Sequence, residues 1–223
     1  MTVKFINSLL LFTFVICSGF TFDVVSHTHT QNDSYESVPD TSYLRLETRI
    51  TAGENDVEES GTNGNIYFNS TDLELCHDRT STGNQVVGLR FTGIYLPPGV
   101  EITRAYIEFT VDESVNTPGL LTISGEDAVN SEAFQAQAYD VSSRARTYAS
   151  VAWLPTDWLA DGSMVIQRSE DISEIVQEIV NKDDFWGIGI AMTFIIEGDG
   201  KRIAKSHELD PNAAPMLYVE FEF

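Results

Sequence analysis

Cysteine is almost absent from this chain, which has 2 cysteines in 223 residues. Cys17 falls in the N-terminal segment discussed below, so the remainder has Cys76 alone and forms no internal disulfide. The fold must therefore rest on a hydrophobic core, which a domain of about 180 residues can bury without disulfides. We expect Cys76, between Leu75 and His77, to be a small buried residue and not a nucleophile.

Basic residues are scarce. The chain has 13 Lys and Arg against 34 Asp and Glu, a formal net charge of -21. Such a field repels nucleic acid and anionic membranes and attracts cations, so we expect no nucleic-acid partner. Two interpretations of the acidic excess stay open: a solvated coat that maintains solubility, or a subset of carboxylates that converges on a metal.

Recognisable catalytic motifs are missing. The sequence has no Gly-x-Ser-x-Gly elbow, no His-Glu-x-x-His and no Cys/His pair at metal-ligand spacing. Glycoside hydrolysis requires only two carboxylates at a set separation, and 34 acidic residues are compatible with that. We expect a non-enzyme, with a polysaccharide lyase or hydrolase as an alternative.

Long apolar runs are missing except near the N-terminus. There Lys4 precedes an apolar run over Leu9–Cys17, and the small residue Gly19 follows. This order predicts a secretory signal peptide over residues 1–19, and the run is shorter than the ~20 residues that span a bilayer. We expect a secreted protein with no membrane insertion after cleavage. A retained anchor and lipid attachment at Cys17 remain alternatives.

Residues 20–41 are polar and lack periodicity, which predicts a flexible linker, and residues 42–223 then predict one domain. Asn32 and Asn69 each begin a glycosylation-type triplet, and the sequence leaves open whether either is modified.

Alternating apolar and polar residues dominate the domain. In 104–112, Ala105, Ile107, Phe109 and Val111 fall on one face, the pattern of a half-buried strand. The turn Pro97–Gly99 separates this strand from another over 86–96. Further strands are predicted over 44–50, 66–68, 72–76, 120–126, 188–196, 201–206 and 217–223, and 53–64 is predicted to be a polar loop.

One segment has helical spacing. Ile172, Ile175, Val176 and Ile179 recur at i, i+3, i+4 and i+7, which predicts a short helix over 171–181 with Asp171 in a capping box. Many short strands with one helix favour an all-β fold, an antiparallel β-sandwich of the jelly-roll kind.

Several stretches resemble a secreted jelly-roll domain of modular proteins from environmental and marine bacteria, a domain similar to non-catalytic carbohydrate-binding modules. The resemblance covers roughly 48–221 and implies a binding domain with many possible ligands. It is carried by Val86–Glu113, Ser70–Glu74, Ser142–Thr147, Val151–Trp153, Ile175–Asn181, Gly200–Ser206 and Ala213–Pro215.

Calcium is the metal that the carboxylates would suit, because Ca²⁺ takes 6–8 oxygen ligands from carboxylates and loop carbonyls. Asp56 and Glu58 lie in the predicted loop after the first strand, and Asp72 and Glu74 share a face of a short strand. The resemblance implies a structural calcium near the first and last strands, which would add Asp210. The alternative is that these acids are exposed or paired with Arg90, Arg144 or Arg202.

A sugar site needs an aromatic plate with polar groups around it. We expect Trp158, in the loop after Pro155, to be the better exposed candidate. Tyr148 is a further aromatic candidate, and Arg144 and Arg146 could contact an acidic polysaccharide. Trp153 and Trp186 are expected in the core. The sequence therefore predicts a secreted, non-catalytic binding module for glycan or another extracellular polymer, stabilised by calcium if the carboxylates converge. The alternative is an acidic structural or adhesive matrix protein.

Overall fold

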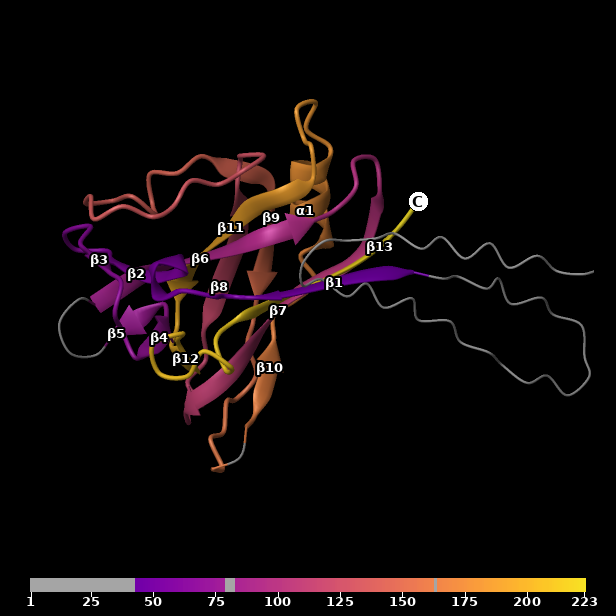
Figure 1. Cartoon of the computed structure of the whole chain (residues 1–223). Helices are drawn as coiled ribbons and strands as arrows, with labels where there is room; N and C mark the ends of the chain where they lie inside the picture. Colours follow the sequence, from indigo (N-terminus) through magenta and orange to yellow (C-terminus); the bar gives the residue numbers. More distant parts are fainter. Residues whose placement is uncertain (1–42, 79–82, 163) are drawn as a thin grey trace, which may run out of the picture.

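The computed structural model describes residues 43–78, 83–162 and 164–223 (Figure 1). The predicted signal peptide and linker lie outside the described residues, and so does Asn32. In the part of the chain that is described, no helix has the length and apolar character needed to cross a bilayer.

Two antiparallel sheets make up the fold, which confirms the predicted all-β sandwich. The first sheet has the order β1-β13-β7-β12-β4, and β10 also pairs with β7. Its strands are β1 (Leu44–Arg49), β4 (Asp72–Leu75), β7 (Glu101–Glu113), β10 (Ile166–Arg168), β12 (Arg202–Lys205) and β13 (Met216–Glu222).

The second sheet has the order β3-β2-β6-β11-β8-β9, and β5 also pairs with β6. Its strands are β2 (Asp56–Ser60), β3 (Ile66–Tyr67), β5 (His77–Asp78), β6 (Gly83–Tyr95), β8 (Leu120–Glu126), β9 (Arg146–Trp153) and β11 (Ile188–Asp199). A short 3-10 turn, η1 (Gly53–Asn55), precedes β2.

The core lies between the inner faces of the two sheets. The alternation seen in the sequence is confirmed: Ile107 and Phe109 of β7 are buried, as are Met192 and Phe194 of β11. Phe194 meets Phe91 edge to face with ring centroids 6.0 Å apart. Burying each large apolar side chain contributes about 1.5–3 kcal/mol, so this core can hold the fold without disulfides. Cys76 is buried as expected, and burial raises the pKa of its thiol.

The turn at Pro97–Gly99 is a corner between the sheets. The two strands it joins, β6 and β7, belong to different sheets and do not pair with each other. Earlier in the chain the same crossing recurs: the chain passes from β1 in the first sheet to β2 in the second, returns to β4 in the first and continues to β6 in the second. Such crossings are expected of a jelly-roll-like sandwich.

The prediction of a polar loop over 53–64 is wrong for the middle of that range, which forms the fully buried strand β2. Its carboxylates accept backbone hydrogen bonds from distant segments: Asp56 from His207, Glu58 from Glu74, and Glu59 from Val141 and Ser142. These long-range bonds compensate for taking charged residues out of water, which the local pattern could not reveal.

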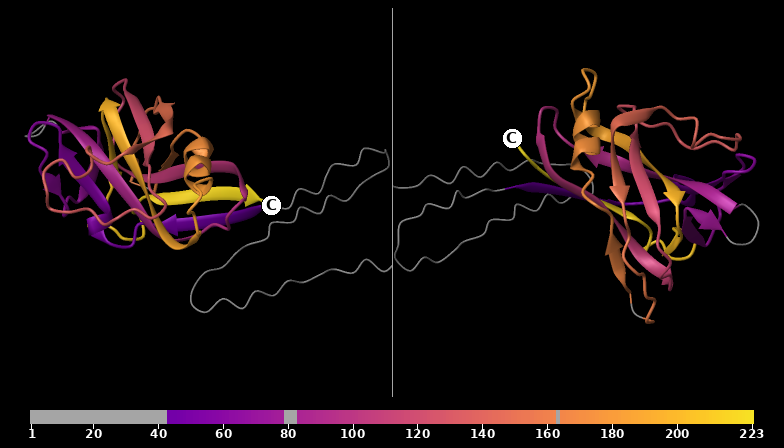
Figure 2. Two further views of the ribbon diagram at one scale, coloured as in Figure 1. Left: turned by 90° about the horizontal axis from the view of Figure 1, so that it is seen from above. Right: turned by 180° about the vertical axis from the view of Figure 1, so that it is seen from behind.

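The predicted helix is confirmed as α1 (Ser173–Val180), with Ile175, Val176 and Ile179 buried. Asp171 accepts a hydrogen bond from the Ser173 N–H at 2.9 Å, but it stands one residue before the N-cap position, which Ile172 occupies. Both views in Figure 2 place α1 beside the β6–β7 corner, where the Gln177 side chain bonds the backbone of Val100 and Ile102.

Residues 127–145 connect β8 to β9 and cover part of the outer face of the second sheet (Figure 1, upper left). Phe134 and Val141 of this connection form a small buried cluster with Val57 of β2 and Ile195 of β11. We call it the β8–β9 cover. The outer face of the first sheet has no corresponding cover among the residues that the structure describes.

Candidate functional site

The structure exposes a different tryptophan from the one that the sequence predicts to be exposed. Trp158 is 0% exposed, so the prediction that it is the exposed platform is wrong. It packs against Phe109 and Trp153, with ring centroids 6.0 and 6.2 Å away, and its backbone forms a bridge with Val115. The bridge carries the loop across the end of the sandwich, which turns the indole inward. Trp153 is buried, as expected.

Trp186 is the exposed tryptophan, with 48% of its surface accessible, so its predicted place in the core is also wrong. It lies in the loop between α1 and β11. Its indole Nε1–H donates to the Ile188 carbonyl at 3.2 Å, which fixes the ring close to the start of β11. The ring is therefore presented to solvent in a defined orientation.

Two glycines produce this presentation. Gly187 has φ +69° and Gly189 has φ +66°, and a Cβ on Gly187 would lie 1.8 Å from the Leu96 carbonyl oxygen. The pairing of β11 with β6 shifts register twice just beyond, around Ile190. Positive φ and bulges break the alternation of the strand and re-aim side chains, so Trp186 leaves the core side. The sequence signal was the Gly187-Ile188-Gly189 spacing, which interrupts an otherwise regular strand.

We define the Trp186 platform as three residues where β11 begins beside the end of β6: Tyr95, Trp186 and Ile188. Ile188 is 67% exposed and pairs with Tyr95 across β6 and β11. The Tyr95 hydroxyl lies 4.0 Å from where a Cβ on Gly189 would stand. The exposed residues Asp183 and Asp184 precede the platform in the same loop. An apolar plate with hydroxyl and carboxylate groups nearby is the chemistry that contacts both the ring face and the hydroxyls of a sugar.

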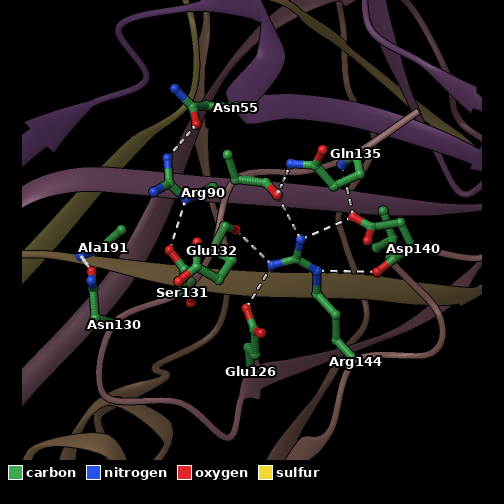
Figure 3. A network of polar contacts seen from close by, with 12 residues as sticks. Asn55, Arg90, Glu126, Asn130, Ser131, Glu132, Gln135, Asp140, Arg144 and Ala191 are labelled. Carbon is green, nitrogen blue, oxygen red and sulfur yellow. Dashed lines mark hydrogen bonds and ion pairs between the residues drawn. The ribbon is translucent and has the colours of Figure 1, made fainter. Parts of the chain in front are cut away.

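Arg144, predicted to contact ligand, anchors the β8–β9 cover instead (Figure 3). Its guanidinium bonds the carboxylates of Glu126 at 2.8 Å and Asp140 at 2.9 Å, and it also donates to the carbonyls of Glu132, Ala133 and Asp140. Its Cζ lies 4.4 Å from the centroid of the Phe134 ring. Only 8% of its side chain is exposed, so it has little left to offer a ligand.

The start of the cover is held in the same way. Arg90 donates to the Ser131 carbonyl at 3.1 Å and to the Asn55 side chain at 2.9 Å, and Asn130 accepts the Ala191 N–H at 2.8 Å (Figure 3). Arg90 of β6 therefore ties the cover to β6 and η1, Asn130 ties it to β11, and Arg144 ties it to β8.

The other two predicted ligand residues lie on β9, away from Trp158. Arg146 donates to the carbonyls of Val141 and Arg144, and its ion pair with Glu197 is long, at 3.7 Å. Tyr148 is 100% exposed. The structure thus does not bring Trp158, Tyr148, Arg144 and Arg146 together into one site.

A groove of about 500 Å³ lies between α1 and the start of β7, lined in part by Glu101, Glu174 and Glu178. Glu178 accepts the N–H groups of Tyr148 and Ala149, so its carboxylate holds α1 to β9. No aromatic side chain of the described residues lines this groove, which makes it a weaker sugar site than the Trp186 platform.

The predicted metal ligands divide into separate groups. Asp72 and Glu74 share the outer face of β4, as predicted, and Glu74 lies 3.3 Å from the Lys201 ammonium. Glu58 is buried behind them, and burial raises its pKa to about 8. Asp210 accepts the Asn212 N–H in its own loop. Within the described ranges, no group of three or more His, Cys, Asp and Glu side chains could hold a metal ion.

Among the residues that the structure describes, Asp56 and Glu208 are neighbouring carboxylates that each have one buried oxygen without a hydrogen-bond partner. Asp56 is 3% exposed, and its Oδ1 and the Oε2 of Glu208 are both buried without a hydrogen bond. Glu208 lies against Gly53, where a Cβ would stand 1.3 Å from its Oε1. Burial, with repulsion from Glu208, raises the pKa of Asp56 to about 8. A proton or a cation is needed to offset two such charges.

Comparisons with known proteins leave the family open. No protein-family model and no curated protein matches the chain. Among solved structures, it is similar to the CBM22-1–GH10 modules of the N-terminal endo-1,4-beta-D-xylanase 10B of Clostridium thermocellum, complexed with xylohexaose. The identity is 10% over 79% of this chain and 27% of that chain, with a TM-score of 0.25. The chain thus spans about a quarter of that structure, and a likeness this low carries no argument about function.

Proposed function

We propose that this protein is a secreted, non-catalytic domain that binds an extracellular polysaccharide through the Trp186 platform. The observation that carries the proposal is the half-exposed Trp186 indole, oriented by its bond to Ile188 and by two glycines with positive φ. An exposed indole costs solvation free energy, and a sugar ring face would cover it. Secretion rests on the charge and apolar pattern of residues 1–19.

The platform supports a shallow, chain-binding mode. Trp186 and Ile188 present an apolar surface, while Asp183 and Asp184 stand on the same loop to accept hydrogen bonds from sugar hydroxyls. The loop sits on two rigid elements, α1 and β11, so little ordering is needed on binding.

The test is binding of the Trp186→Ala variant to soluble xylan, mannan and mixed-linkage glucan, measured by affinity electrophoresis and calorimetry. Removing a central aromatic anchor costs about 2 kcal/mol, so the affinity should fall about 30-fold for whichever polymer the wild type binds. Tyr148→Ala is the matched control, because it deletes another exposed aromatic side chain, on β9 and outside the loop that carries Trp186.

Thermal unfolding must accompany the binding data. Trp186→Ala should unfold within about 2 °C of wild type, since the residue lies outside the core. Equal affinity of Trp186→Ala and wild type, or no binding of wild type to any of the three polymers, would refute the proposal.

A second candidate function is that of an acidic matrix protein that binds calcium and self-associates. It is favoured by the net charge of -21 and by the unpartnered oxygens of Asp56 and Glu208. These two residues would hold the ion, with the remaining ligands from backbone or water. Light scattering in chelator and in millimolar calcium tests it: growth in mass with calcium supports it, and an unchanged mass contradicts it.

A further inference from the structure

The outer face of the first sheet carries a stacked tyrosine pair. Tyr106 of β7 lies directly opposite Tyr218 of β13, with ring centroids 4.5 Å apart and planes 8° from parallel. Their neighbours Ala105, Ile107 and Val219 point into the core, so the tyrosines point outward. Both rings are nevertheless largely covered, with 6% and 8% of their surfaces exposed.

Two guanidinium groups provide part of that covering. Arg168 of β10 has its Cζ 4.5 Å from the Tyr106 ring centroid, and Arg104 of β7 has its Cζ 5.3 Å from it. β10 pairs with β7 and brings Arg168 opposite Glu108, although the two arginines are far apart in sequence. A guanidinium held on an aromatic face is fixed in orientation and partly stripped of water, which prepares it to bind an anion.

The two arginines are unequally paired. Arg168 uses its Nε to bind Glu108 at 2.8 Å, which leaves the outer Nη groups of its fork without a described partner. Arg104 is exposed and makes no hydrogen bond or ion pair with any residue that the structure describes. A role in holding β10 to β7 explains Arg168 Nε but gives Arg104 no function.

The charge of this face differs from that of the chain. We define the arginine–tyrosine face by nine residues that point outward around Tyr106 and Tyr218 on four neighbouring strands, whereas Asp112 and Glu222 point outward farther along β7 and β13. The nine residues are Arg45, Glu47, Arg49, Arg104, Tyr106, Glu108, Arg168, Tyr218 and Glu220.

This face holds 4 of the 13 basic residues of the chain and 3 of its 34 acidic ones, whereas the whole chain has a net charge of -21. Its glutamates have partners: Glu47 lies 3.8 Å from Arg45, Glu108 binds Arg168, and Glu220 accepts the Tyr218 hydroxyl at 2.5 Å. With four arginines against three glutamates, the nine residues carry a net charge of +1, and the two arginines with unused donors, Arg104 and Arg168, both lie at Tyr106.

From this arrangement we propose that Arg104 and Arg168 form a second binding site, for the carboxylate or sulfate groups of an acidic polysaccharide. The flat fork of each guanidinium matches two oxygens of such a group, and Tyr106 sets the spacing between the forks. The site is on the first sheet and does not depend on the Trp186 platform. The site gives this acidic protein a local positively charged surface to which an acidic polymer can bind.

The test uses polygalacturonate, dextran sulfate and uncharged dextran as probes, with the whole mature chain and affinity electrophoresis at low and moderate salt. We expect wild type to bind an anionic probe and not dextran, with weaker binding as salt rises. Arg104→Gln should lower the affinity at least tenfold, and Arg104→Lys should recover only part of it because an ammonium lacks the fork. The two anionic probes distinguish carboxylate from sulfate.

Lys205→Gln is the matched control: it removes one positive charge from the same sheet outside the face, and its affinity should stay within about twofold of wild type. Trp186→Ala should keep the anionic binding. The proposal is overturned if Arg104→Gln binds as wild type does, if Lys205→Gln loses as much affinity as Arg104→Gln, or if wild type binds neither anionic probe. Arg168→Gln repeats the test, with thermal unfolding to detect loosening of β10.

Discussion

Two arginine-centred regions stand on opposite outer faces of this sandwich and differ in how completely their donors are used. On the second sheet, Arg144 binds two carboxylates and three carbonyls and holds the β8–β9 cover in place. On the first sheet, Arg104 lies over Tyr106 and binds nothing else among the described residues. An arginine whose guanidinium donors have partners within the protein, which we call saturated, is part of the fold. An arginine whose donors lack partners, which we call unsaturated, is available for a ligand when an aromatic ring fixes its position.

The same criterion separates the buried charges. Arg202 is 1% exposed, yet four carbonyls accept from its guanidinium, those of Thr117, Pro155, Thr156 and Lys201. Asp56 is nearly as buried and has one oxygen without a partner. We therefore expect Arg202 to be silent in titrations and Asp56 to respond to pH and cations.

The largest expected effect is the response of Asp56 to pH. A carboxyl whose pKa is 3.8 in the unfolded chain and about 8 in the folded one keeps its stability contribution below pH 4 and loses it as pH rises to about 8. The loss is on the order of 5 kcal/mol. Asp56→Asn, which keeps an acceptor for the His207 N–H, should match wild type near pH 4 and unfold at a higher temperature near pH 8.5.

Melting curves from pH 4 to 9 in chelator measure this difference, and parallel curves for wild type and Asp56→Asn would contradict it. Repeating the series with calcium tests the cation alternative. Calcium should raise the melting temperature of wild type at pH 8.5 but not that of Asp56→Asn, and no rise in wild type would exclude calcium at this pair.

A smaller change in stability is expected when Arg144, the arginine with saturated donors, is replaced. Arg144→Gln leaves Glu126 and Asp140 without their cation and removes the guanidinium from the Phe134 ring, so the free energy of unfolding should fall by about 3–5 kcal/mol. That corresponds to a melting temperature lower by roughly 10 °C. Arg104→Gln is the paired measurement and should leave the melting temperature nearly unchanged. Equal losses in the two variants would remove the distinction between saturated and unsaturated arginines.

A smaller loss of stability than that of Arg144→Gln is expected at Arg146, whose donors have more partners than those of Arg104 and fewer than those of Arg144. Its two bonds to carbonyls and its long ion pair with Glu197 should together contribute about 0.5–1 kcal/mol. Urea unfolding of Arg146→Gln measures this difference. A loss as large as that of Arg144→Gln would show that the cover is held cooperatively and not by Arg144 chiefly.

The sequence determined the parts of this protein that depend on short-range periodicity. The alternation at Ala105, Ile107 and Phe109 and the helical spacing at Ile175 and Ile179 specify which faces must be buried, so most of the strands, the helix and the all-β sandwich could be predicted. The strands β2, β5, β9 and β10 were not predicted. These patterns repeat within one element and need no knowledge of its neighbours.

Only the tertiary structure decided which polar and aromatic residues are buried and which are exposed and available to a ligand. β2 has acidic residues and no apolar alternation, and it is buried because His207, Glu74 and Val141 supply hydrogen bonds from far along the chain. Trp158 and Trp186 exchanged their expected places because a bridge to Val115 turns one inward and two glycines turn the other outward. Arg104 and Arg168 meet at Tyr106 because β10 pairs with β7. Apart from Trp186, whose two glycines are its neighbours in sequence, each outcome depends on a partner distant in sequence, and local composition does not encode that partner.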